Sequence, residues 1–237
     1  MKRLDWWIGG AASLALLYAS WVGWAPFGMT TPSLTEALGF VTGGACVYLT
    51  VRENVWNFPV GIANSVFFLV LFAGARLFAD AALQVVFIAL GFQGWYLWLR
   101  GGDDHTPLEV ERASLKLLAG VAAFVAAATA GLTLFLRTVH DSAPFLDAFT
   151  TALSLGAQYL LNRKAIENWL LWMTADVIYV YLYATPPRQL YLTAVLYLVF
   201  LCLCVAGLRS WLKTMSGRGR EEGDAAPVLE VGGASRG

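Results

Sequence analysis

Charge is scarce in this sequence of 237 residues. Lys, Arg, Asp and Glu together make up 14% of it, against 58% for hydrophobic residues. A soluble domain carries about 25% charged and about 45–50% apolar residues. Positive and negative charges also balance to a formal net charge of zero, which offers no basic surface for nucleic acid. The composition therefore predicts an integral membrane protein that does not bind nucleic acid.

Cysteine and histidine are rare, and nucleotide motifs are missing. The three cysteines lie in apolar runs, where thiols behave as small hydrophobic groups. The two histidines fall in predicted loops without a nucleophile motif, and the chain has no G-x-x-x-x-G-K-[ST] run for binding ATP. We therefore expect no disulfide, no metal site, no cofactor, no enzymatic activity and no pumping driven directly by ATP.

Long apolar runs make up most of the chain. A membrane-spanning helix needs about 20 mostly apolar residues. The segments that fit this description are 5–24, 34–51, 56–75, 77–99, 113–136, 145–163, 167–184 and 189–212. Segment 5–24 either spans the bilayer or lies flat in its interface, and the sequence leaves both open. The Gly-rich, charged residues 214–237 are predicted to form a disordered cytoplasmic tail.

Basic residues set the predicted orientation in the inner (plasma) membrane, because Lys and Arg collect on the cytoplasmic side. With the N-terminus inside, the cytoplasmic ends of the segments receive Lys2, Arg3, Arg52, Arg100, Arg112, Arg163, Lys164, Arg209, Lys213, Arg218 and Arg220. The opposite side keeps only Arg76, Arg137 and Arg188. Both termini are therefore predicted to be cytoplasmic.

Two regions of the chain, 34–99 and 145–213, resemble each other. Their matching residues are Tyr48 and Tyr159, Arg52 and Arg163, Asn57 and Asn168, Asn64 and Asp176, and Gly94-x-x-x-Trp98 and Gly207-x-x-x-Trp211. We predict an all-α integral membrane protein of two parallel three-helix bundles in these regions. A linker transmembrane helix within 100–144 joins them in a 3+1+3 order, and an N-terminal hydrophobic helix lies in 1–33.

Polar residues recur inside the apolar runs, close to tryptophans. Asn57 and Asn64 share one helical stripe, and Asn168, Trp172 and Asp176 share another. Asp176 falls near the middle of its span, where a carboxylate is costly unless it is protonated or faces water, a donor or a substrate. Amides among aromatic rings suit a planar heteroaromatic ring that bears a sugar. The alternative is bonding between helices in a scaffold without a cavity.

The same residues resemble the PnuC family of nicotinamide riboside transporters, over about residues 34–213. The resemblance is carried by Glu53-Asn-Val-Trp-Asn-Phe-Pro-Val-Gly-Ile-Ala-Asn64, Phe78-Ala-Asp-Ala-Ala-Leu-Gln84, Gly94-Trp-Tyr-Leu-Trp98, and Arg163-Lys-Ala-Ile-Glu-Asn-Trp-Leu-Leu-Trp172 with Asp176. Two positions depart from the family pattern. Phe78 stands where tyrosine is common, and Leu208 stands where an aromatic is common, which leaves the substrate open.

The resemblance implies a SWEET-like fold and facilitated diffusion of nicotinamide riboside into the cell, where phosphorylation traps it. It implies a substrate site that contains Trp56, Asn57, Asn64, Gln84, Trp95, Asn168, Trp172 and Asp176. The expected partners are the vitamin, the lipid bilayer and further copies of the chain in a homotrimer. Thiamine or another nucleoside-like vitamin, with or without proton coupling, is the alternative substrate. A membrane scaffold that transports nothing is the alternative of another class.

Overall fold

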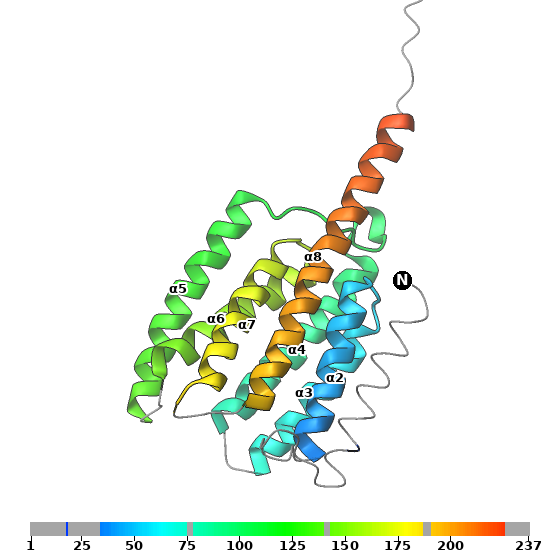
Figure 1. Cartoon of the computed structure of the whole chain (residues 1–237). Helices are drawn as coiled ribbons and strands as arrows, with labels where there is room; N and C mark the ends of the chain where they lie inside the picture. The colour runs from blue at the N-terminus through cyan, green and yellow to red at the C-terminus, as the bar shows by residue number, and fades with distance from the viewer. Residues whose placement is uncertain (1–17, 19–33, 75–77, 140–142, 187–190, 226–237) are drawn as a thin grey trace, which may run out of the picture.

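The computed structural model describes residues 18, 34–74, 78–139, 143–186 and 191–225, and these are almost entirely helical (Figure 1). The helices are α2 (Leu34–Val51), α3 (Asn57–Gly74), α4 (Phe78–Arg100), α5 (Leu115–Thr138), α6 (Pro144–Asn162), α7 (Asn168–Ala184) and α8 (Tyr191–Ala225). A 3-10 turn, η2 (Asp103–His105), follows α4. The predicted all-α class is confirmed. The predicted segment 5–24 lies outside the described residues, except for Tyr18.

Four of these helices contain stretches long and apolar enough to cross a membrane. The stretches are Asn57–Gly74, Ala81–Arg100, Leu115–Thr138 and Thr193–Gly217, and α2 contributes a shorter apolar stretch, Ala37–Val51. Helices α6 and α7, which we also predicted to span, are not among the four. Much of α6 is buried against its neighbours, including Thr150 and Asn162. Polar residues are tolerated there because the neighbouring helices, and not lipid, surround them.

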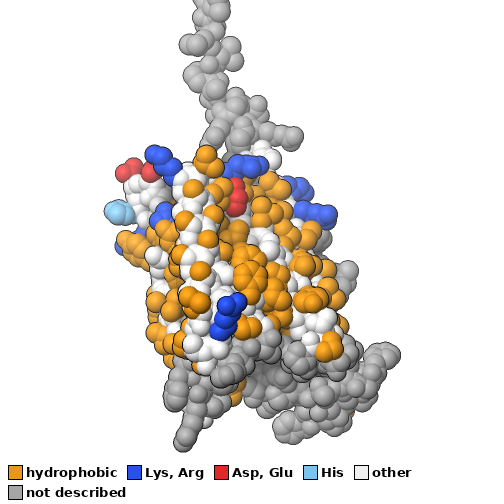
Figure 2. Space-filling view, turned by 90° about the vertical axis from the view of Figure 1, so that its left-hand side faces the viewer, with side chains coloured by type: hydrophobic (Ala, Val, Ile, Leu, Met, Phe, Trp, Pro, Cys, Tyr) orange, Lys and Arg blue, Asp and Glu red, His pale blue; other side chains and the backbone are white. Residues whose placement is uncertain are grey.

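Hydrophobic side chains cover the flank of the molecule, and most of the charged ones gather near one end (Figure 2). Val70, Leu134 and Val177 are all more than half exposed. A soluble protein rarely exposes so much contiguous apolar surface, whereas a flank in contact with lipid requires it. The distribution is that of a multi-pass membrane protein.

Helix α8 extends beyond the predicted end of its span at residue 212. It continues to Ala225 and projects past the other helices (Figure 1). Within this extension Thr214 donates a hydrogen bond to the Glu53 carboxylate at 2.8 Å, and Ser216 donates to the Leu212 carbonyl at 2.9 Å. The Thr214 bond ties the start of the region 214–237, which we predicted to be a disordered tail, to the turn after α2. Residues 226–237 lie outside the described part.

The helices pack as two sets that meet along two seams. Helix α3 packs against both α2 and α4, α7 packs against both α6 and α8, and α5 packs on α6. The first set meets the second where α2 contacts α8 and where α4 contacts α6. Segments far apart in the sequence are thereby brought together around the centre of the molecule.

The turns that follow α2 and α6 are built alike. Glu53 and Lys164, at matching positions, both adopt a positive φ, of 53° and 50°. Asn57 and Asn168, at the starts of α3 and α7, each donate a side-chain N–H to the carbonyl three residues earlier, at 3.1 and 2.7 Å. Each bond gives a backbone carbonyl of the turn a hydrogen-bond partner close by in the sequence, where the chain reverses between two helices.

Two tryptophans make matching bonds across the seams. Trp98 on α4 donates its indole N–H to the Leu161 carbonyl at the end of α6, at 3.0 Å. Trp211 on α8 donates its own to the Thr50 carbonyl at the end of α2, at 3.2 Å. Since the last carbonyls of a helix have no partner within it, each set of helices caps an end of the other.

Candidate functional site

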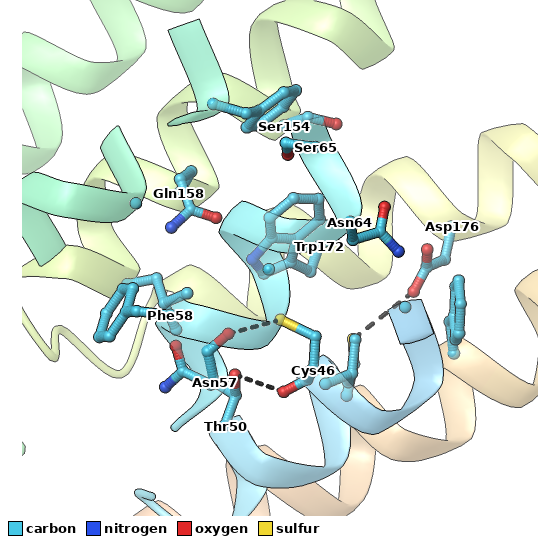
Figure 3. A pocket seen from close by; sticks show the side chains of 18 of the residues that line it. Cys46, Thr50, Asn57, Phe58, Asn64, Ser65, Ser154, Gln158, Trp172 and Asp176 are labelled. Carbon is cyan, nitrogen blue, oxygen red and sulfur yellow. Dashed lines mark hydrogen bonds between the residues drawn. The ribbon is translucent and has the colours of Figure 1, made fainter. Parts of the chain in front are cut away.

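A cavity of about 320 Å³ lies between the two sets of helices (Figure 3). Residues of α2, α3, α4, α6, α7 and α8 line it, and its wall is mainly apolar with a few polar side chains. Small-molecule sites in proteins are typically concave, mostly apolar and about 300–1,000 Å³ in volume. The cavity therefore has the size and the chemistry of a site for a small solute.

The predicted site residues divide into two groups of equal size. Those that line the cavity are Asn57, Asn64, Trp172 and Asp176. The residues outside its lining are Trp56, Gln84, Trp95 and Asn168. Figure 3 shows Trp172 on the cavity wall, with Gln158 and Asp176 on either side of it.

The four residues outside the lining have other surroundings. Trp56 precedes α3 and is 65% exposed at the end of the bundle. Trp95 packs beside the buried aromatic cluster described below, and Gln84 is half-buried on α4. Asn168 is fully buried and donates to the Ala165 carbonyl, which leaves its own side-chain oxygen without a bond in the described structure. Its amide therefore builds the turn before α7.

Sequence reasoning missed several polar residues of the cavity. They are Cys46, Thr50, Ser65, Ser154, Gln158 and Cys204. Ser154 and Gln158 lie four apart on α6, so their polar spacing was a signal of a shared face. Gln158 donates to Asn162 at 2.9 Å, and Asn162 donates to the Leu90 carbonyl of α4 at 2.7 Å. This chain of bonds ties the cavity wall to the seam between α4 and α6.

Asn64 and Asp176 face the cavity from the two different sets of helices. The side-chain nitrogen of Asn64 donates to the Gly39 carbonyl at 3.2 Å and to the Thr42 hydroxyl at 2.6 Å. The Asp176 carboxylate accepts a bond from the Cys204 thiol, with the atoms 3.5 Å apart. Asn64 is thus bonded to α2 and Asp176 to α8, so both polar groups are held in place by a neighbouring helix.

Stacked tyrosines lie beside Asp176. The ring centroids of Tyr179 and Tyr197 are 4.6 Å apart, and those of Tyr183 and Tyr197 are 5.5 Å apart with an angle of 6° between the planes. Tyr179 of α7 and Ser154 of α6 both line the cavity. Flat aromatic faces on this side of the cavity, together with Trp172, suit a planar ring.

An aromatic cluster lies beside the cavity, near the ends of α2 and α6, and consists of Phe58, Trp98, Trp211 and Trp169. Centroid distances between successive members are 5.0, 6.0 and 5.3 Å. Phe58 and Trp169 also line the cavity, and the Trp169 indole N–H has no hydrogen-bond partner in the described structure. Beyond the cluster Lys164 stands 4.6 Å over the Trp98 ring. The described residues contain no group of three potential metal ligands.

Curated proteins similar to this chain are transporters. The nicotinamide riboside transporter PnuC of Escherichia coli (strain K12) is 27% identical over 213 residues, which cover 79% of this chain and 88% of that protein. The riboflavin/roseoflavin transporter RibM of Streptomyces davaonensis is 25% identical over 200 residues, covering 83% and 90%. Similarity therefore extends over most of each protein.

A crystal structure of the vitamin B3 transporter PnuC shares the fold, with a TM-score of 0.62, 21% sequence identity and coverage of 89% of this chain and 92% of that one. The sequence profile of one family, described as nicotinamide mononucleotide transporter, matches residues 33–213. That match spans most of the chain and takes in every helix that lines the cavity. The chain therefore belongs to the nicotinamide mononucleotide transporter family, which includes PnuC, and it is a membrane transporter and not an enzyme.

Proposed function

We propose that the chain carries nicotinamide riboside into the cell by facilitated diffusion. The observation that carries this proposal is the cavity between the two sets of helices, lined by amides, a carboxylate and flat aromatic rings. Transporters with internal repeats place their substrate between the repeats, near the middle of the bilayer. Relatives named as nicotinamide riboside transporters support the choice of solute.

The groups of the cavity match the chemistry of this solute. Trp172 offers a face on which the pyridinium ring stacks. The side-chain nitrogens of Gln158 and Asn57 are bonded within the protein, so these amides offer their oxygens to the ribose hydroxyls and to the N–H groups of the carboxamide. Asp176 offers a carboxylate to the positive charge of the ring. The relative named as a riboflavin transporter points to a second candidate. A cavity of about 320 Å³ favours the smaller solute, which has one ring where riboflavin has three fused rings.

The architecture in this proposal is two three-helix repeats, α2–α4 and α6–α8, joined by α5. The matching turns and the reciprocal indole bonds support it. Transport then requires the two repeats to move against each other, which exposes the cavity to one side of the membrane at a time. We also propose cytoplasmic termini and a homotrimer, in line with the distribution of basic residues and with the family resemblance.

Uptake by purified protein in liposomes tests the function. We expect nicotinamide riboside to enter down its own gradient without any pH gradient, and to be blocked by excess unlabelled solute. Complete dependence on a pH gradient would replace facilitated diffusion by proton coupling. Absence of uptake and of binding for nicotinamide riboside, thiamine and riboflavin alike would favour the scaffold alternative.

A pair of tryptophan substitutions tests the site. Trp172→Ala removes a ring from the cavity wall, and we expect it to weaken binding of nicotinamide riboside about tenfold or more. Trp56→Ala is the matched control, because that side chain is 65% exposed and outside the lining. It should change affinity by less than about twofold. Equal effects of the two substitutions would contradict the proposed site.

A further inference from the structure

The cavity contains one formally charged side chain. Among its described lining residues Asp176 is the only acid, and none is Lys, Arg or His. Asp176 is 4% exposed, and the ion pair found in the described structure joins two other residues. A buried carboxylate without a cationic partner is costly in an apolar environment. A cation bound in the cavity would provide the missing charge.

The first set of helices is neutral at the matching position. Asn64 on α3 corresponds to Asp176 on α7, and both line the cavity. The amide nitrogen of Asn64 is already used by Gly39 and Thr42 of α2, so the group that remains is its uncharged carbonyl oxygen. The two halves of the cavity therefore differ in charge even though the turns that lead into α3 and α7 are alike.

A thiol from α8 holds the Asp176 carboxylate. Cys204 is 4% exposed, and its sulfur lies 3.5 Å from one carboxylate oxygen. A thiol is a weak hydrogen-bond donor, so it orients the carboxylate without satisfying it. The second oxygen and the remaining lone pairs stay available to a ligand. Cys46, the other thiol of the cavity, donates instead to the Asn57 backbone carbonyl at 3.3 Å.

We propose that Asp176 and Cys204 together select for a cationic ring. The Asp176 carboxylate pairs with the positive charge of the bound solute, and Cys204 is a positioning residue that aims this carboxylate into the cavity. The inference rests on the proposed function, in which the ring is a pyridinium. It adds a specificity pair that is present in one half of the cavity and absent from the other.

Two solutes of nearly the same shape separate charge from fit. Nicotinamide riboside has a positively charged ring, and its dihydro form has an uncharged one. We expect the purified protein to bind the charged form about tenfold more tightly, measured by isothermal titration calorimetry. Asp176→Asn keeps the volume and removes the charge, so it should bring the ratio of the two affinities close to one.

Substitutions at two thiols of α8 test the positioning role. Cys204→Val removes the donor at similar volume and should lower the affinity ratio about threefold, whereas Cys204→Ser keeps a donor and should restore it. Cys202→Val is the matched control and should leave the ratio unchanged, because that exposed thiol of α8 lies outside the cavity lining. A ratio that survives Cys204→Val would refute the role of Cys204.

The outcomes for the unsubstituted protein separate this inference from the proposed function. Equal affinity for the two forms would overturn the charge selection and leave nicotinamide riboside transport standing. Binding of neither form would overturn both. If Asp176→Asn fails to fold, the affinity ratio of the unsubstituted protein and the Cys204 series still decide the question.

Discussion

Neutralising Glu53 should destabilise this protein far more than neutralising a charge on its exposed ends. The Glu53 carboxylate lies 3.5 Å from the Lys164 ammonium, and the two side chains are only 23% and 10% exposed. Its other oxygen accepts the bond from Thr214, and Lys164 stands over the Trp98 ring. The pair therefore joins the matching turns after α2 and α6 and also holds α8 to the first of them.

The magnitude follows from this partial burial. Exposed ion pairs contribute about 0.2–1 kcal/mol, and removing one partner of a fully buried pair costs about 3–5 kcal/mol. Glu53→Gln keeps the volume and an acceptor for Thr214, so it isolates the charge. We expect it to lower the free energy of unfolding by about 2 kcal/mol, which lowers Tm by about 4–8 °C for a chain of this length.

A double-mutant cycle with Lys164→Met provides the assay. The loss for the double variant should be smaller than the sum of the two single losses by about 1 kcal/mol or more, because the second substitution removes a charge that the first left unpaired. Thermal unfolding in detergent micelles, followed by tryptophan fluorescence, measures each variant. Arg52→Gln is the control, since that exposed side chain lies 6.0 Å from the Tyr48 ring centroid and should change stability by less than about 0.5 kcal/mol. Additive losses, or a Glu53 effect equal to that of Arg52, would refute the reasoning.

Two further substitutions probe the packing that closes the cavity. Gly207→Ala should lower the free energy of unfolding by about 1–3 kcal/mol, because a Cβ there would overlap the Trp169 ring. Gly120→Ala is the control and should be neutral or stabilising, because the space around Gly120 is open. Similar stability of the two variants in thermal unfolding would contradict the contact between Gly207 and Trp169. Trp98→Phe should cost about 1 kcal/mol, since it keeps an aromatic ring but removes the indole bond to the Leu161 carbonyl, which then accepts only the backbone N–H of Lys164. Unchanged stability would show that the indole bond contributes nothing.

The helices could be predicted closely because each membrane-crossing segment must satisfy its own backbone. The predicted 34–51 matches α2 (Leu34–Val51), and the predicted 113–136 lies within two residues of α5 (Leu115–Thr138). In hydrocarbon a helix pairs every backbone group within the segment, so apolar length and the breaks between runs define it. The end of α8 could not be predicted in this way, because a bond to another part of the fold, from Thr214 to Glu53, holds the start of its extension.

Half of the predicted site residues line the cavity, for a similar reason. Asn57, Asn64 and Asp176 are polar groups in apolar spans, and the spacing of polar residues is enough to predict that such groups face a partner or a cavity. Which side chains meet in one space depends on how the helices pack: Trp56 is exposed, whereas Gln158 and Cys204 line the cavity. Helical periodicity defines the faces of each helix in the sequence, but the packing of α2 on α8 and of α4 on α6, between residues far apart in the chain, selects the faces that line the cavity.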